Sequence, residues 1–151
     1  MQSIANQLES LVEEVSALLT PERVHDWHAT PTPTQWSKAE VLGHLVDSAL
    51  HNLSRFVRGT YESDFALTYA QNEWVRAQRY QQTPVPATAE LWRLLNRQLA
   101  HVLRHYPAER HTARCDVGQH GPAWATMEEV AHDYLAHLRH HLRQLELPLA
   151  G

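Results

Sequence analysis

Four long stretches of the chain carry apolar residues at the spacing of an amphipathic helix. In residues 4–19 they recur every three or four positions, with acidic residues between them. The same period returns over residues 38–58, 88–106 and 127–147. Strand-like alternation is nearly absent, and only 5 residues are glycine. The pattern predicts a chain that is almost wholly helical.

Local signals mark the ends of these helices and the segments between them. Ser37 with Glu40, and Thr126 with Glu129, form capping boxes, which start helices. Prolines follow the first, third and last helices, at Pro21, Pro107 and Pro148. Between the long helices, residues 69–80 predict a short helix, and residues 111–117 with 123–125 predict a short hairpin. The apolar residues of the third long helix are expected to face the core: Leu91, Leu94, Leu95, Leu99, Val102 and Leu103.

Together these elements predict an all-α fold: a four-helix bundle with a long connection between the second and third long helices. The length of 151 residues suits a single domain over residues 1–151. The net charge of −4 offers no basic surface for nucleic acid. No apolar run is long enough to cross a membrane, and the first residues do not resemble a signal peptide. With Cys115 as the single cysteine, we expect a cytoplasmic protein.

His137 and His141 lie four residues apart in the last helix, on one helical face, where both imidazoles can reach one metal ion. Because 12 residues are histidine, chance alone gives about one such pair, so the spacing is weak evidence by itself. His101 and His105 form a rival pair, which we interpret as surface or packing histidines because no third ligand accompanies them.

His44 is the best candidate for a third ligand, and three histidines leave a tetrahedral ion with one open position, as in catalytic sites. On a helical wheel, however, His44 lies away from the apolar stripe of its helix, so it either lines a pocket or is simply exposed. Asp47 and Asp133 each lie one turn from a candidate ligand. Either acid could orient an imidazole through its second N–H, or be an ordinary solvated carboxylate, which we favour for Asp133.

Three segments resemble the DinB/YfiT-like superfamily, whose name refers to a DNA-damage-inducible protein. Residues 36–48 resemble the start of that family's second helix, residues 69–74 its mid-chain aromatic motif, and residues 137–144 its closing H-x-x-H-H-x-x-Q helix. The resemblance implies a four-helix bundle, often a homodimer, with a divalent metal on three histidines. Carried over to this sequence, the ligands are His44, His137 and His141, and His140 is not a ligand.

The resemblance implies a metal site more strongly than it implies a reaction. Our leading hypothesis is an enzyme with zinc or nickel as cofactor and a small-molecule substrate, either a hydrolase or a transferase of a low-molecular-weight thiol. Asp47 is the candidate for a catalytic, proton-handling group. The alternatives are a non-catalytic dimeric bundle that binds metal or small molecules in a stress response, and a structural protein without metal.

Overall fold

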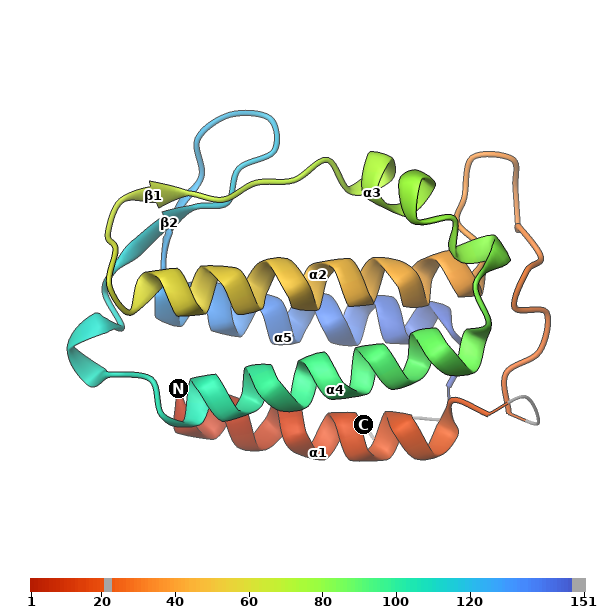
Figure 1. Ribbon diagram of the computed structural model, residues 1–151, viewed down its shortest axis with the longest axis horizontal. Coiled ribbons are helices and arrows are strands. Elements are labelled where there is room, and N and C mark those ends of the chain that lie inside the picture. The colour runs from red at the N-terminus through yellow and green to blue at the C-terminus, as the bar shows by residue number, and fades with distance from the viewer. Residues whose placement is uncertain (21–22, 148–151) are drawn as a thin grey trace.

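Four long helices run side by side in the computed structural model, which describes residues 1–20 and 23–147. They are α1 (Gln2–Leu18), α2 (Lys38–Gly59), α4 (Val85–Arg104) and α5 (Met127–Gln144). Figure 1 shows that α2 and α4 run in one direction, and α1 and α5 in the other. Because α2 and α4 are parallel, the chain must return along the whole bundle between them, which accounts for the long connection predicted there.

The predicted helices are confirmed, with ends that shift by up to three residues. Ser37 and Thr126 cap α2 and α5, each with the reciprocal bond from its glutamate. The predicted short helix is α3 (Gln71–Gln78), and a turn of 3-10 helix, η1 (Tyr80–Gln82), leads into α4. A second such turn, η2 (Ala108–Arg110), follows α4. Pro21 and Pro148, two of the predicted stop signals, lie outside the described residues.

The fold is not purely all-α as predicted, because it contains a small three-stranded sheet. The predicted hairpin is present as β2 (Arg114–Asp116) paired antiparallel with β3 (Trp124–Thr126). The sequence did not predict β1 (Phe65–Ala66), which pairs in parallel with β2. Two residues are too few for an alternating pattern, and the partner strand lies far along the chain, so no local signal marks β1.

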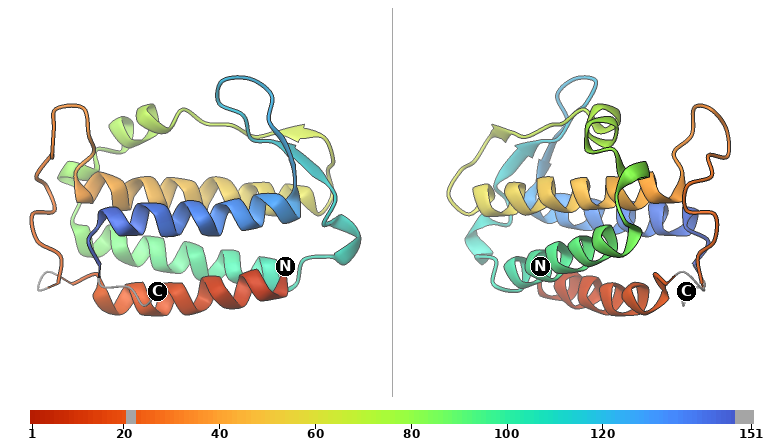
Figure 2. Two further views of the ribbon diagram at one scale, coloured as in Figure 1. Left: turned by 180° about the vertical axis from the view of Figure 1, so that it is seen from behind. Right: turned by 45° about the vertical axis from the view of Figure 1, so that its right-hand side comes forward.

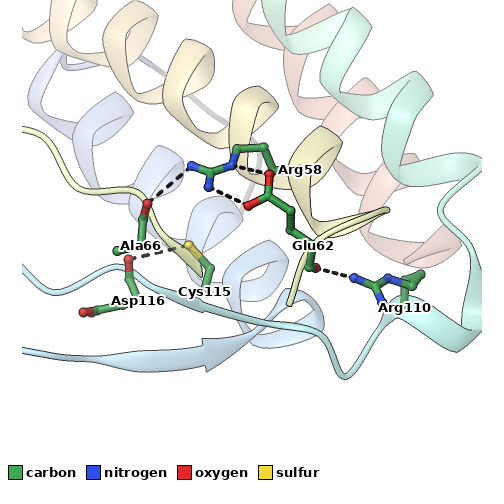
Figure 3. A network of polar contacts seen from close by, with 6 residues as sticks. All are labelled: Arg58, Glu62, Ala66, Arg110, Cys115 and Asp116. Atoms are coloured by element: carbon green, nitrogen blue, oxygen red, sulfur yellow. Dashed lines mark hydrogen bonds and ion pairs between the residues drawn. The ribbon is translucent and has the colours of Figure 1, made fainter. Parts of the chain in front are cut away.

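Polar contacts hold this sheet to the end of α2 (Figure 3). The Arg58 guanidinium forms a two-pronged ion pair with Glu62 and also donates to the Ala66 carbonyl. Arg110 donates to the Glu62 carbonyl, and the Cys115 thiol donates to the Asp116 carbonyl. The sheet and the segment leading to α3 thereby lie over the outer side of α2 and α5 (Figures 1 and 2).

The core joins all four long helices, and α4 packs against both α1 and α2. The predicted inward face of α4 is partly wrong, because Leu91 and Leu94 are exposed whereas Trp92 and Asn96 are fully buried. Asn96 can be buried because its amide donates to the Trp92 carbonyl and its Oδ1 accepts from Tyr134 at 2.5 Å. Within the described residues, no helix has the length and hydropathy to span a membrane.

Candidate metal centre

Helices α2 and α5 lie against each other in opposite directions, and their facing sides bring together three histidines. His44 comes from the first half of α2, and His137 and His141 from the second half of α5. The Nε2 atoms of His44 and His137 are 3.1 Å apart. One nitrogen from each ring lies within 4.8 Å of the others. Among the described residues, this is the one group of three or more histidine, cysteine or acidic side chains so close together.

The structure buries His44 in the interior, so the alternative that His44 is simply exposed is wrong. Its exposed fraction is 0%. The cause is that α2 is covered on several sides, by α4, by α5 and by the segment of α3 and η1. A polar face of α2 is therefore buried together with its apolar face: His44, Asp47, Ser48, His51, Asn52 and Arg55. Their recurrence at helical spacing was the signal that this face lines an interior.

The outer ring nitrogens of the two α5 histidines have partners. His141 Nδ1 lies 3.0 Å from Gln144 Oε1, one turn further along the helix. His137 Nδ1 lies 3.5 Å from Ser48 Oγ, at the limit of a hydrogen bond. Each contact leaves Nε2 free to face the cluster. The sequence assigned no role to Gln144 or Ser48, although the i,i+3 spacing of His141 and Gln144 was visible in it.

His44 is held differently from the other two rings. Its Nδ1 is buried without a hydrogen-bond partner. The ring packs against the indole of Trp36, a residue just before the start of α2, and the two ring centroids are 4.8 Å apart. Trp36 also lies near His141, at 6.5 Å between ring centroids, and so covers one side of the cluster.

The three imidazoles are neutral at ordinary pH. Burial is the largest cause for each ring and lowers the pKa of His44 to about 3 and that of His137 to about 4. Burial also lowers the pKa of His141, against a raising effect of the bond to Gln144. A neutral imidazole keeps the lone pair that a metal ion needs. Two nitrogens bound to a tetrahedral zinc ion lie roughly 3.3 Å apart, close to the 3.1 Å between His44 and His137. The donor types and the spacing of the His44–His137 pair therefore suit a divalent cation, with the third nitrogen within 4.8 Å.

Asp47 is fully buried one turn from His44, but its carboxylate faces other partners. Its Oδ1 accepts from the Tyr80 hydroxyl at 2.7 Å and from the Gln78 amide at 3.3 Å, while Oδ2 has no partner in the structure. Burial raises the pKa of Asp47, and the bonds from Tyr80 and Gln78 oppose that rise. Because His44 Nδ1 is unpartnered, Asp47 does not orient that imidazole in this structure.

The remaining candidates lie outside the cluster. His140 is exposed on the outer side of α5. His101 is exposed on α4 and His105 directly after its last residue, and His105 Nδ1 bonds the His101 carbonyl instead of facing a shared ion. Asp133 is exposed, in agreement with its interpretation as a solvated acid.

Two cavities flank the three histidines. One, of about 130 Å³, is lined by His137 together with Ser48, Asn52 and Arg55 of α2. The other, of about 520 Å³, is lined by His141 with Trp36 and Lys38. Each cavity therefore borders one of the two α5 histidines, whereas His44 lines neither of them.

The comparisons with known proteins agree with this architecture. The family model of the DinB superfamily matches residues 6–145. The fold resembles the solved structure of YfiT from Bacillus subtilis, described as a probable metal-dependent hydrolase with an unusual four-helix bundle topology. The TM-score is 0.78 at 19% identity, covering 94% of this chain and 83% of that one. No curated protein matches the chain. Since the family model spans most of its length, the chain belongs to the DinB superfamily.

Proposed function

We propose that this protein is a hydrolase that depends on one divalent metal ion bound by His44, His137 and His141. The observation that carries the proposal is the convergence of three neutral imidazole nitrogens within 4.8 Å, on the facing sides of two helices. The description of YfiT as a probable metal-dependent hydrolase supports the same reaction class.

Imidazole ligands suit zinc, nickel and copper, and availability in the cell favours zinc or nickel over copper. When bound, such an ion supplies Lewis acidity, which polarises a carbonyl or phosphoryl group and lowers the pKa of water. Three protein ligands leave a position open for substrate. Zinc and nickel are therefore the two metals to test first.

The residues around the cluster have separate tasks in this proposal. Gln144 orients the His141 ring through its Nδ1 atom, and Ser48 is the candidate for the same task at His137 Nδ1, 3.5 Å away. Trp36 keeps water from one side of the His44 ring. Asp47 is our candidate for a proton-handling group, because it is buried, its pKa is raised, and its Oδ2 is unpaired.

The proposal also covers the size of the substrate, the oligomeric state and the cellular compartment. The substrate is a small molecule, because the cavities beside the histidines are about 130 and 520 Å³. We further propose a cytoplasmic homodimer, from the lone cysteine and from the family resemblance. Size-exclusion chromatography with light scattering tests the dimer directly.

A substrate screen on zinc- and nickel-loaded protein tests the reaction. We expect hydrolysis of activated esters such as p-nitrophenyl acetate, lost on chelation and reduced at least about tenfold in His137→Ala. His140→Ala is the matched control, since that imidazole lies one turn away and is exposed. Asp47→Asn should slow turnover while metal content is unchanged.

Parallel assays with cysteine and an electrophile such as chlorodinitrobenzene separate hydrolysis from transfer. Turnover that requires the thiol, without ester hydrolysis, would replace the hydrolase by a thiol transferase at the same centre. Metal binding with neither activity would leave a binding protein.

A further inference from the structure

Arg55 is a buried cation that forms no ion pair with a carboxylate in the described part of the chain. Its exposed fraction is 7%. The ion pairs among the described residues all use lysines or arginines other than Arg55. A guanidinium stays charged in proteins, so this residue carries a positive charge into the bundle.

The partners that Arg55 does have are neutral. Its Nε and Nη2 both donate to the Leu67 carbonyl, at 3.0 and 2.7 Å, and Nη1 donates to Asn52 Oδ1 at 3.2 Å. The Cys115 thiol is also within hydrogen-bonding reach. These acceptors use fewer N–H groups than a guanidinium offers, so at least one donor remains. A buried charge is costly without an opposite charge, and none of these groups supplies one.

Arg55 also lines the cavity that reaches the metal centre. The cavity of about 130 Å³ has Arg55 and His137 in its wall, with Ser48 and Asn52 between them along α2. Ser48 lies beside His137 Nδ1, and roughly 10 Å of helix separates Ser48 from Arg55. A cavity of about this volume holds a molecule the size of benzene.

We propose that Arg55 binds the carboxylate of the substrate, so that the enzyme acts on small acids whose reacting bond lies at the three histidines. The choice of a carboxylate follows from the planar guanidinium, which matches it in shape and charge, and from the small volume. The second half of the proposal rests on the proposed hydrolase, whereas the anion site itself does not.

Two features of the cavity bear on this proposal. Asp133 lies in the lining, but it is exposed and forms no ion pair with Arg55, so water screens its charge. The bonds from Arg55 to Leu67 also fasten the segment before α3. A neutral hydrogen-bond donor could hold the Leu67 carbonyl equally well. This structural role therefore does not explain why the residue at position 55 carries a positive charge.

Propionate is the probe, and propanamide, of equal size and no charge, is its control. Titrations followed by amide NMR shifts use metal-free and zinc-loaded protein, with metal content measured in each sample. We expect propionate to bind saturably to both forms of the wild-type protein. Propanamide should bind the wild type at least about tenfold more weakly, and propionate should bind Arg55→Met at least about tenfold more weakly. Arg55→Lys should bind with intermediate affinity, and Asp133→Asn at least as tightly as wild type.

Val117→Phe keeps the test sound if Arg55→Met fails to fold. Val117 lines the same cavity and makes none of the bonds to Arg55, so a larger side chain there should block propionate. Equal binding of propanamide, no saturable binding, or binding that needs zinc and ignores Arg55→Met would each overturn the anion site. Arg55-dependent binding in a protein that takes up neither zinc nor nickel would support the anion site and refute the metal-dependent hydrolase.

Discussion

Gly43, next to His44, makes room for Tyr80, and replacing it by alanine should destabilise the protein. A Cβ at position 43 would lie 2.0 Å from Tyr80 Cδ2 and 2.2 Å from Cγ. The ring is buried and cannot give way without moving η1. Moving it would also break the 2.7 Å bond from the Tyr80 hydroxyl to Asp47.

The magnitude follows from three opposing effects. Overpacking a buried site costs about 1–3 kcal/mol. Losing the bond to the buried Asp47 carboxyl costs about 1–2 kcal/mol more. Alanine gains about 1 kcal/mol over glycine in a helix. We therefore expect the free energy of unfolding to fall by about 1–4 kcal/mol, which corresponds to a melting temperature about 2–16 °C lower.

Urea denaturation of a double-mutant cycle measures this effect. In the background of Tyr80→Ala the clashing ring is absent, so Gly43→Ala should be neutral or stabilising there. If Gly43→Ala raises the stability of the wild type, or costs the same in both backgrounds, the contact between Gly43 and Tyr80 does not govern this part of the fold.

Other predictions concern the cap, the core and pH. Ser37→Ala should lower the free energy of unfolding by about 1 kcal/mol in urea, because the N-cap bond of α2 is lost. Tyr134→Phe should cost about 1–3 kcal/mol in the same assay, because Asn96 Oδ1 is left buried without its donor. The metal-free protein should lose stability below about pH 6.5, since the unfolded chain then binds protons on His44 and His137 that the folded chain, with pKa values of about 3 and about 4, does not. Urea midpoints at about pH 7.5 and about pH 5 measure this loss, which should shrink in His44→Gln.

The helices could be predicted from the sequence because their signals are local. Apolar spacing and the capping boxes at Ser37 and Thr126 depend on residues within a few turns. The buried face of α4 could not be predicted in the same way. Asn96 is buried whereas Leu91 and Leu94 are exposed. The burial of Asn96 depends on a hydrogen bond from the hydroxyl of Tyr134, which is distant in sequence.

The candidate site was predictable to a different extent at each residue. The pair on α5 follows from its spacing, and the structure brings His44 to it as the family resemblance implied. A wheel drawn for α2 alone could not show that α3 and η1 cover its polar face. The partner of Asp47 was unpredictable for the same reason, since Tyr80 reaches it from η1. Arg55 drew no attention because a lone arginine on a polar face is ordinary until its burial is known.

Metal content tests the central claim most directly. Untagged protein, purified without added metal, should contain close to one zinc or nickel ion per chain by elemental analysis. His44→Ala and His137→Ala should each lose that ion, whereas His140→Ala and His101→Ala should keep it, because those two imidazoles are exposed outside the cluster. Wild-type protein that stays free of metal after incubation with both ions, or an ion that survives His44→Ala, would contradict the three-histidine site.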